Sequence, residues 1–142
     1  MSVRLLIATT IVGCSGPSST PDAPLDQISI DAEPPSALPL RLSETGLYTD
    51  IAQKTLASAS REYTPRHPLW SDDATKTRWI QLPAGAMIDT TDIDRWTFPV
   101  GTKLWKEFAK DGKRLETRLV WRVADTGDRE RDTLLGSYVW DD

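Results

Sequence analysis

Asp111-Gly112 is the feature of this sequence that most constrains the fold. The pair stands between two runs, 102–110 and 113–124, that are rich in aromatic and other apolar side chains. A two-residue Asp-Gly connection fits a type I′ turn, in which both central residues have positive φ and which joins antiparallel strands directly. The sequence therefore predicts a β-hairpin with its turn at these two residues.

The second of these runs alternates in polarity along its length. Every second residue from 115 to 123 is apolar or threonine, and the residues between them are mostly charged. Successive side chains of a strand point to opposite faces, so this pattern predicts a strand with one buried face and one solvated face. The face expected to be solvated carries Arg114, Glu116, Arg118 and Arg122.

Further strands are predicted at 77–82, 86–90, 95–99 and 133–140, each bounded by turn residues. One short helix is predicted over 51–60, because Asp50 can cap it, Gln53 completes a capping box, and Ile51 and Leu56 recur at helical spacing. Short strands with a single helix predict a mostly β fold. The expected form is an antiparallel β-sandwich or a partly open barrel with one short N-terminal helix.

The first 13 residues have the pattern of a signal peptide. Residues 5–12 are largely apolar but too few to span a bilayer. Ile11-Val12-Gly13-Cys14 resembles a bacterial lipobox, which implies that Cys14 carries a lipid; the alternative is an ordinary secretory peptide. Since Cys14 is the single cysteine, the chain has no disulfide, no thiolate metal site and no CxxCH haem attachment. We expect no cofactor within it.

Residues 14–39 form an expected linker, and residues 40–142 form an expected single β domain. The linker holds six of the ten prolines and no Lys or Arg, which favours an extended, solvated tether. Acidic and basic residues are nearly balanced in the domain, so its composition gives no electrostatic case for nucleic acid binding.

Residues 63–83 gather three prolines, two tryptophans and the single histidine. A hydrolase would need His67, Ser71 and a carboxylate within hydrogen-bond reach, yet prolines flank the histidine and no glycines surround the serine. We assign no catalytic residue, and the expectation leans away from an enzyme. The lesser alternative is a carboxylate-dependent enzyme that uses Asp72 or Asp89.

Metal sites are not expected either. Residues 89–94 place oxygen ligands at alternating positions but lack the glycine and distal glutamate of an EF-hand loop, so an acidic turn is favoured over calcium binding. Of the six tryptophans, Trp79, Trp96 and Trp121 are predicted in the core. Trp70 is predicted to be the most exposed, which leaves carbohydrate or small-ligand binding as an alternative function.

The order of motifs along residues 42–142 resembles a non-haem module that accompanies c-type cytochrome domains in exported bacterial proteins. LSETGLY opens the pattern, and PLWSD, a Lys-x-Arg-Trp strand, FPVGT, ETRL and YVW follow. This resemblance implies that haem c is carried by a further domain or a partner. The chain ends at Asp142, directly after the YVW tail, so we expect either a stand-alone protein or a truncated reading frame.

Lys76 and Arg78 lie two positions apart on a predicted strand and therefore point the same way. Two interpretations of this corner remain open. In one, the loop folds over the sheet with Trp70 as an apolar plug and Asp72 paired to Lys76 or Arg78. In the other, the corner is a ligand or partner surface. The candidate binding surface comprises Trp70, Asp72, Lys76, Arg78, Glu116 and Arg118.

Together these features predict a lipid-anchored and non-catalytic protein on the periplasmic or outer-membrane side of a bacterial envelope. The expected role is a binding or docking module associated with a c-type cytochrome redox system. This expectation comes from the family resemblance rather than from a recognised site.

Overall fold

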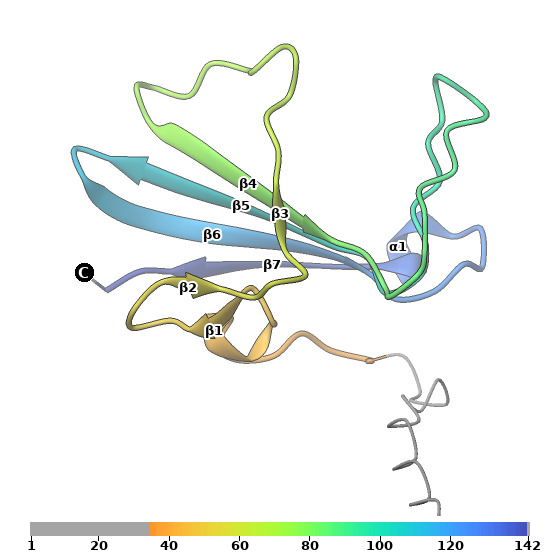
Figure 1. Ribbon diagram of the computed structural model, residues 1–142, viewed down its shortest axis with the longest axis horizontal. Helices are drawn as coiled ribbons and strands as arrows, with labels where there is room; N and C mark the ends of the chain where they lie inside the picture. The colour runs from red at the N-terminus through yellow and green to blue at the C-terminus, as the bar shows by residue number, and fades with distance from the viewer. Residues whose placement is uncertain (1–34, 142) are drawn as a thin grey trace, which may run out of the picture. The chain divides into compact units, whose positions relative to one another are not determined.

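The computed structural model describes residues 35–141 (Figure 1). The expected signal peptide, Cys14 and most of the linker lie outside these residues. The described part is mostly β and contains two antiparallel sheets, which confirms the predicted class. The elements are η1 (Leu42–Glu44), β1 (Tyr48–Asp50), β2 (Thr55–Leu56), β3 (Arg61–Glu62), β4 (Thr75–Gln81), β5 (Lys103–Lys110), β6 (Lys113–Arg122), α1 (Arg129–Asp132) and β7 (Thr133–Val139).

The larger sheet is a five-stranded meander in the order β3-β4-β5-β6-β7, and β1 pairs with β2 in the smaller one. Figure 1 shows β4 to β7 running side by side, with long excursions at 63–74 and 82–102. Every neighbouring pair is antiparallel. These pairings do not by themselves establish a sandwich or a barrel.

The predicted hairpin between β5 and β6 is confirmed. Asp111 has φ 53° and Gly112 has φ 78°, so both central residues of the turn are left-handed, as a type I′ turn requires. Lys110 and Lys113 pair directly across the turn. The predicted strand at 133–140 is also present, as β7.

The helix predicted over 51–60 is wrong. Residues 51–54 form the turn between β1 and β2. The carboxylate of Asp50 accepts a hydrogen bond from the backbone N–H of Gln53 at 2.9 Å, so the hydrogen bond expected of a helix cap does form. The turn does not continue as a helix, because Lys54 has φ 56° and the chain then enters β2.

One face of the five-stranded sheet carries the core. Trp79, Trp105 and Leu119 are opposite one another on β4, β5 and β6, and each is at most 5% exposed. The segment before the sheet covers them, because Leu47 and Tyr48 of the β1 region belong to the same buried cluster. Burial of these large side chains supplies most of the apolar stabilisation of so small a domain.

Buried polar groups fix the covering segment to this face. The indole N–H of Trp105 donates to the hydroxyl of Thr45 at 3.1 Å, and that hydroxyl donates to the carbonyl oxygen of Leu42 at 2.7 Å. The ammonium of Lys103 donates to the carbonyl oxygen of Thr45 at 2.8 Å and lies over the ring of Trp121. Thr45 is fully buried, so the loss of these partners would leave unsatisfied groups in the core.

A second polar cluster joins β1 to the sheet around Glu107. Its carboxylate accepts hydrogen bonds from the hydroxyls of Tyr48 at 3.3 Å and Thr117 at 3.4 Å. The indole N–H of Trp140 donates to the hydroxyl of Thr117 at 3.0 Å. Burial, together with the neighbouring carboxylate, raises the pKa of Tyr48 to about 12.

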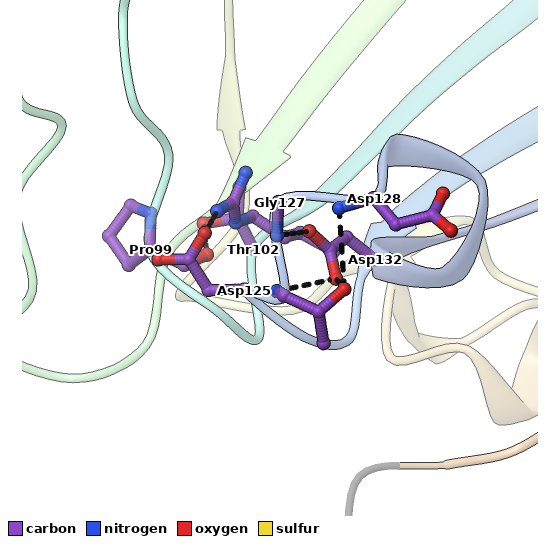
Figure 2. Close-up of polar contacts among 8 residues, drawn as sticks. Pro99, Thr102, Asp125, Gly127, Asp128 and Asp132 are labelled. Atoms are coloured by element: carbon purple, nitrogen blue, oxygen red, sulfur yellow. Dashed lines mark hydrogen bonds and ion pairs between the residues drawn. The ribbon is translucent and has the colours of Figure 1, made fainter.

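Asp132 organises the corner between β6 and β7 (Figure 2). Its buried carboxylate accepts hydrogen bonds from the backbone N–H and the hydroxyl of Thr126, both at 2.8 Å, and from the N–H of Gly127 at 3.1 Å. The backbone hydrogen bond from Thr126 is the main cause that lowers the pKa of Asp132. Nearby, Asp128 caps α1 and Arg122 pairs with Asp125.

Thr45→Val is expected to reduce the free energy of unfolding by about 1–3 kcal/mol, because the buried indole N–H of Trp105 then lacks an acceptor. Urea denaturation followed by tryptophan fluorescence measures the change. Thr49→Val is the matched control at an exposed position of β1 and should stay within about 0.5 kcal/mol of the native chain. Equal effects of the two substitutions would contradict the role given to Thr45.

Asp132→Asn is expected to lower the unfolding temperature at pH 7. Because folding lowers the pKa of this carboxyl, its contribution is fully present above the unfolded pKa of about 3.9 and is lost as pH falls through the folded pKa. The difference between the native chain and the variant should therefore shrink below about pH 4. Thermal unfolding at pH 7 and pH 3 measures it, with Asp111→Asn as the control. A pH-independent difference would refute this account.

Candidate docking surface

The sheet face opposite the core has a row of cations across three strands. Arg78 on β4, Lys106 on β5 and Arg118 on β6 are directly opposite one another in the register. Cβ atoms of directly opposed residues lie about 5 Å apart. Lys76 lies two residues before Arg78 and so shares its face, as the sequence predicted. We call Lys76, Arg78, Lys106 and Arg118 the basic face.

A β-bulge creates this row. The two-residue turn alone would pair Lys106 with Thr117, but the register shifts by one residue between Phe108 and Ala109. Lys106 therefore pairs with Arg118. Arg114 was expected on the solvated face with Arg118, and this is wrong because the bulge lies between them. Its guanidinium lies 3.3 Å from the centre of the Trp140 ring, beside the core cluster.

The charges of the basic face are only partly compensated. Glu116 accepts a hydrogen bond from Arg118 at 2.8 Å and another from the hydroxyl of Ser137 at 2.5 Å. These two bonds lower the pKa of Glu116, that from Ser137 most. Within residues 35–141, no carboxylate lies within ion-pair distance of Arg78 or Lys106.

The pKa of Lys106 reflects this excess of positive charge. Burial is the first cause that lowers its pKa, and the nearby charges of Arg78, Lys76 and Arg118 lower it further, against a raising effect of Glu116. The charged form of a lysine that neighbouring cations repel is stabilised when an anion binds nearby. The face as a whole therefore favours a negatively charged ligand or partner.

Phe108 lies within the basic face. Its ring centre is 4.6 Å from the ammonium of Lys106 and 4.8 Å from the guanidinium of Arg118. Such cation–π contacts stabilise the extended side chains against the sheet without neutralising their charge. At the β7 edge the same face carries Leu135 and Val139, which are 71% and 74% exposed. Cations and uncovered apolar groups thus lie together.

The loop before β4 does not cover this face. Trp70 is 79% exposed and Leu69 is 81% exposed, so the expectation of Trp70 as a buried plug is wrong. Lys76 donates hydrogen bonds to the backbone carbonyl oxygens of both residues. In the described chain Asp72 forms no ion pair with Lys76 or Arg78; instead, its carbonyl oxygen accepts a hydrogen bond from Lys110 at 3.0 Å.

Residues 71–74 form a tight turn. Asp72 and Asp73 have φ values of 48° and 66°, and the N–H of Ala74 donates to the carbonyl oxygen of Ser71 at 2.8 Å. Aspartate tolerates this left-handed conformation better than most residues. The hydroxyl of Ser71 donates to the carbonyl oxygen of Ala74 at 2.7 Å, so this hydroxyl stabilises the turn.

Three adjoining cavities follow this face. One of about 320 Å³ lies between Trp70 and Arg78, one of about 390 Å³ lies over Lys106 and Arg118, and one of about 280 Å³ lies beside Trp96. The first two share Arg78, and the last two share Tyr63. A larger cavity of about 540 Å³ lies at Leu40–Ser43 and the end of β7, and none of the four residues of the basic face lines it.

The acidic segment 89–94 is an ordinary turn. Asp89 and Thr97 form an isolated β-bridge, with both backbone hydrogen bonds at 2.9 Å. The carboxylates of Asp89 and Asp92 accept backbone N–H groups two residues ahead, and the bond from Thr91 lowers the pKa of Asp89. Within the described residues no group of three or more His, Cys, Asp or Glu is placed to hold a metal ion.

Several residues of the candidate surface lie together and others do not. Lys76, Arg78, Glu116 and Arg118 share the face opposite the core, whereas Asp72 and Trp70 belong to the loop at its edge. Trp96 was expected in the core but is 55% exposed. The sequence pattern did not assign Lys106 or Tyr63 to this surface. The bulge brings Lys106 into the cationic row, and Tyr63 directly follows the short strand β3.

Comparison with protein-family models, with curated proteins and with solved structures finds no match to this chain. The resemblance to a cytochrome-accompanying module therefore stays an expectation from the motifs. None of the helices in residues 35–141 is long and apolar enough to cross a membrane.

Proposed function

We propose that this chain is a lipid-anchored, non-enzymatic envelope protein that docks a c-type cytochrome partner through its basic face. The lipid on Cys14 would hold the domain at the periplasmic or outer-membrane side of the envelope, with residues 14–39 as a tether. Haem would belong to the partner, not to this chain. For the fold, we keep the antiparallel sandwich as the finer class, because the β1–β2 region packs on one face of the larger sheet.

The observation that carries this proposal is the row formed by Arg78, Lys106 and Arg118 on the uncovered face. Complementary charge steers two proteins together and fixes their orientation more than it adds affinity. Encounters between electron-transfer proteins are typically small and transient. A basic patch bordered by exposed apolar side chains suits such a complex with an acidic partner surface.

A second candidate function is carbohydrate or small-ligand binding by the loop at residues 63–74. It is favoured by the exposed ring of Trp70 beside a cavity of about 320 Å³. Exposed aromatic rings provide large contact area with little entropy cost. Quenching of tryptophan fluorescence by a sugar, lost in Trp70→Ala, would favour this function over docking.

The docking proposal predicts that charge reversal on the basic face strongly reduces the capture of cytochromes. The full chain is immobilised and exposed at low ionic strength to detergent extracts of bacterial membranes rich in c-type cytochromes. Covalent haem is then stained on denaturing gels. The double variant Arg78→Glu/Lys106→Glu should recover haem protein at least about tenfold less than the native chain, and salt should weaken the native signal.

The matched control is Lys113→Glu/Arg129→Glu, which makes the same charge change at two exposed positions away from this row. It should recover haem protein as the native chain does. The proposal fails if no haem protein is captured, or if both double variants reduce capture equally, since the effect would then follow net charge alone.

A further inference from the structure

Two adjoining cavities on the uncovered face have opposite chemical character. The cavity of about 280 Å³ is lined by apolar and aromatic side chains alone. The neighbouring cavity of about 390 Å³ is lined in part by the cationic row. Tyr63 and Leu104 line both, so the two cavities meet along these side chains. The apolar cavity is lined by Tyr63, Ile80, Ile88, Trp96, Phe98 and Leu104.

We propose that the two cavities together bind one small anionic amphiphile. Its carboxylate would lie on Arg78, Lys106 and Arg118, and its aliphatic chain would fill the aromatic cavity. This inference goes beyond protein docking, because it assigns a small-molecule site. The apolar half of this site has no part in the docking proposal.

The strand register sets the two ends of the site at a fixed distance. Ile80 on β4 pairs with Leu104 on β5, and both lie two residues along their strands from the cationic row. Two residues of a strand span about 6.6–7 Å, and they return to the same face. A ligand whose acid group contacts the cations therefore extends its chain directly over the apolar row.

The cationic end is suited to a carboxylate. Arginine presents a planar fork of donors that matches the two oxygens of a carboxylate, and here two arginines flank one lysine. Glu116 forms an ion pair with Arg118, and none of the described carboxylates lies within ion-pair distance of Arg78 or Lys106. Arg78 and Lys106 are therefore available to an incoming anion.

The apolar end is suited to an aliphatic chain of medium length. The rings of Trp96 and Tyr63 stay 55% and 37% exposed at its rim, so apolar surface there is still in contact with water. At roughly 30 Å³ for each water-sized group, the cavity holds on the order of nine carbon atoms. Decanoate therefore matches the site in both charge and size.

Titration of sodium decanoate into the full chain, below its critical micelle concentration, tests this inference. Calorimetry and tryptophan fluorescence should show saturable binding of one ligand per chain. Each methylene removed from the ligand should weaken binding about fourfold. Uncharged decanol and cationic decyltrimethylammonium should bind at least about tenfold more weakly than decanoate, because they lack the carboxylate.

Variants at the two ends separate this site from unspecific binding. Lys106→Gln and Trp96→Ala should each weaken decanoate binding at least about tenfold. Lys113→Gln and Ile93→Ala change exposed residues that line neither cavity, and both should leave binding unchanged. Unfolding curves confirm that each variant is folded, and if Trp96→Ala is not, Lys106→Gln decides alone.

Three results would overturn the inference. The first is the absence of saturable decanoate binding, and the second is equal binding of decanol. The third is association with anionic phospholipid vesicles but not with monomeric decanoate, which would make this face a membrane contact. The docking proposal is judged separately, by haem-protein capture.

Discussion

The structure depends on the attachment of the segment before the sheet to one face of that sheet. Trp105 donates to Thr45, Lys103 donates to the same residue, and Leu47 belongs to the same buried cluster as Trp105. A domain of this size can build only one core, and this contact uses the large aromatic side chains of the middle strands. The opposite face is covered only in part, where the 82–102 segment meets Ile80 and Leu104, and cations and exposed apolar groups gather on the rest of it.

Local sequence signals predicted the elements that depend on local chemistry. Asp111-Gly112 gave the hairpin correctly, because both residues tolerate the positive φ that the turn needs. Alternation identified β6 and the face of Leu119 and Trp121. The helix expected after Asp50 is absent although the cap forms, because Lys54 has positive φ and the chain turns into β2, which pairs with β1.

The basic face was predictable only in part. Spacing alone places Lys76 and Arg78 on one side of β4, and the wet side of β6 includes Glu116 and Arg118. The sequence pattern does not predict the bulge, which shifts the register by one residue and brings Lys106 between the two arginines. The net charge of the domain does not indicate the basic face either, because an almost neutral domain can still have its cations concentrated on one face.

The relative reactivity of Lys103 and Lys106 tests this two-faced account most directly. The two lysines lie three residues apart on β5 and point to opposite faces, and Lys103 is engaged by Thr45 and Trp121. Amine labelling of the folded chain, read by mass spectrometry, should modify Lys106 faster than Lys103, with exposed Lys113 as the reference. Equal rates, or faster labelling of Lys103, would contradict a covered face opposite an open basic one.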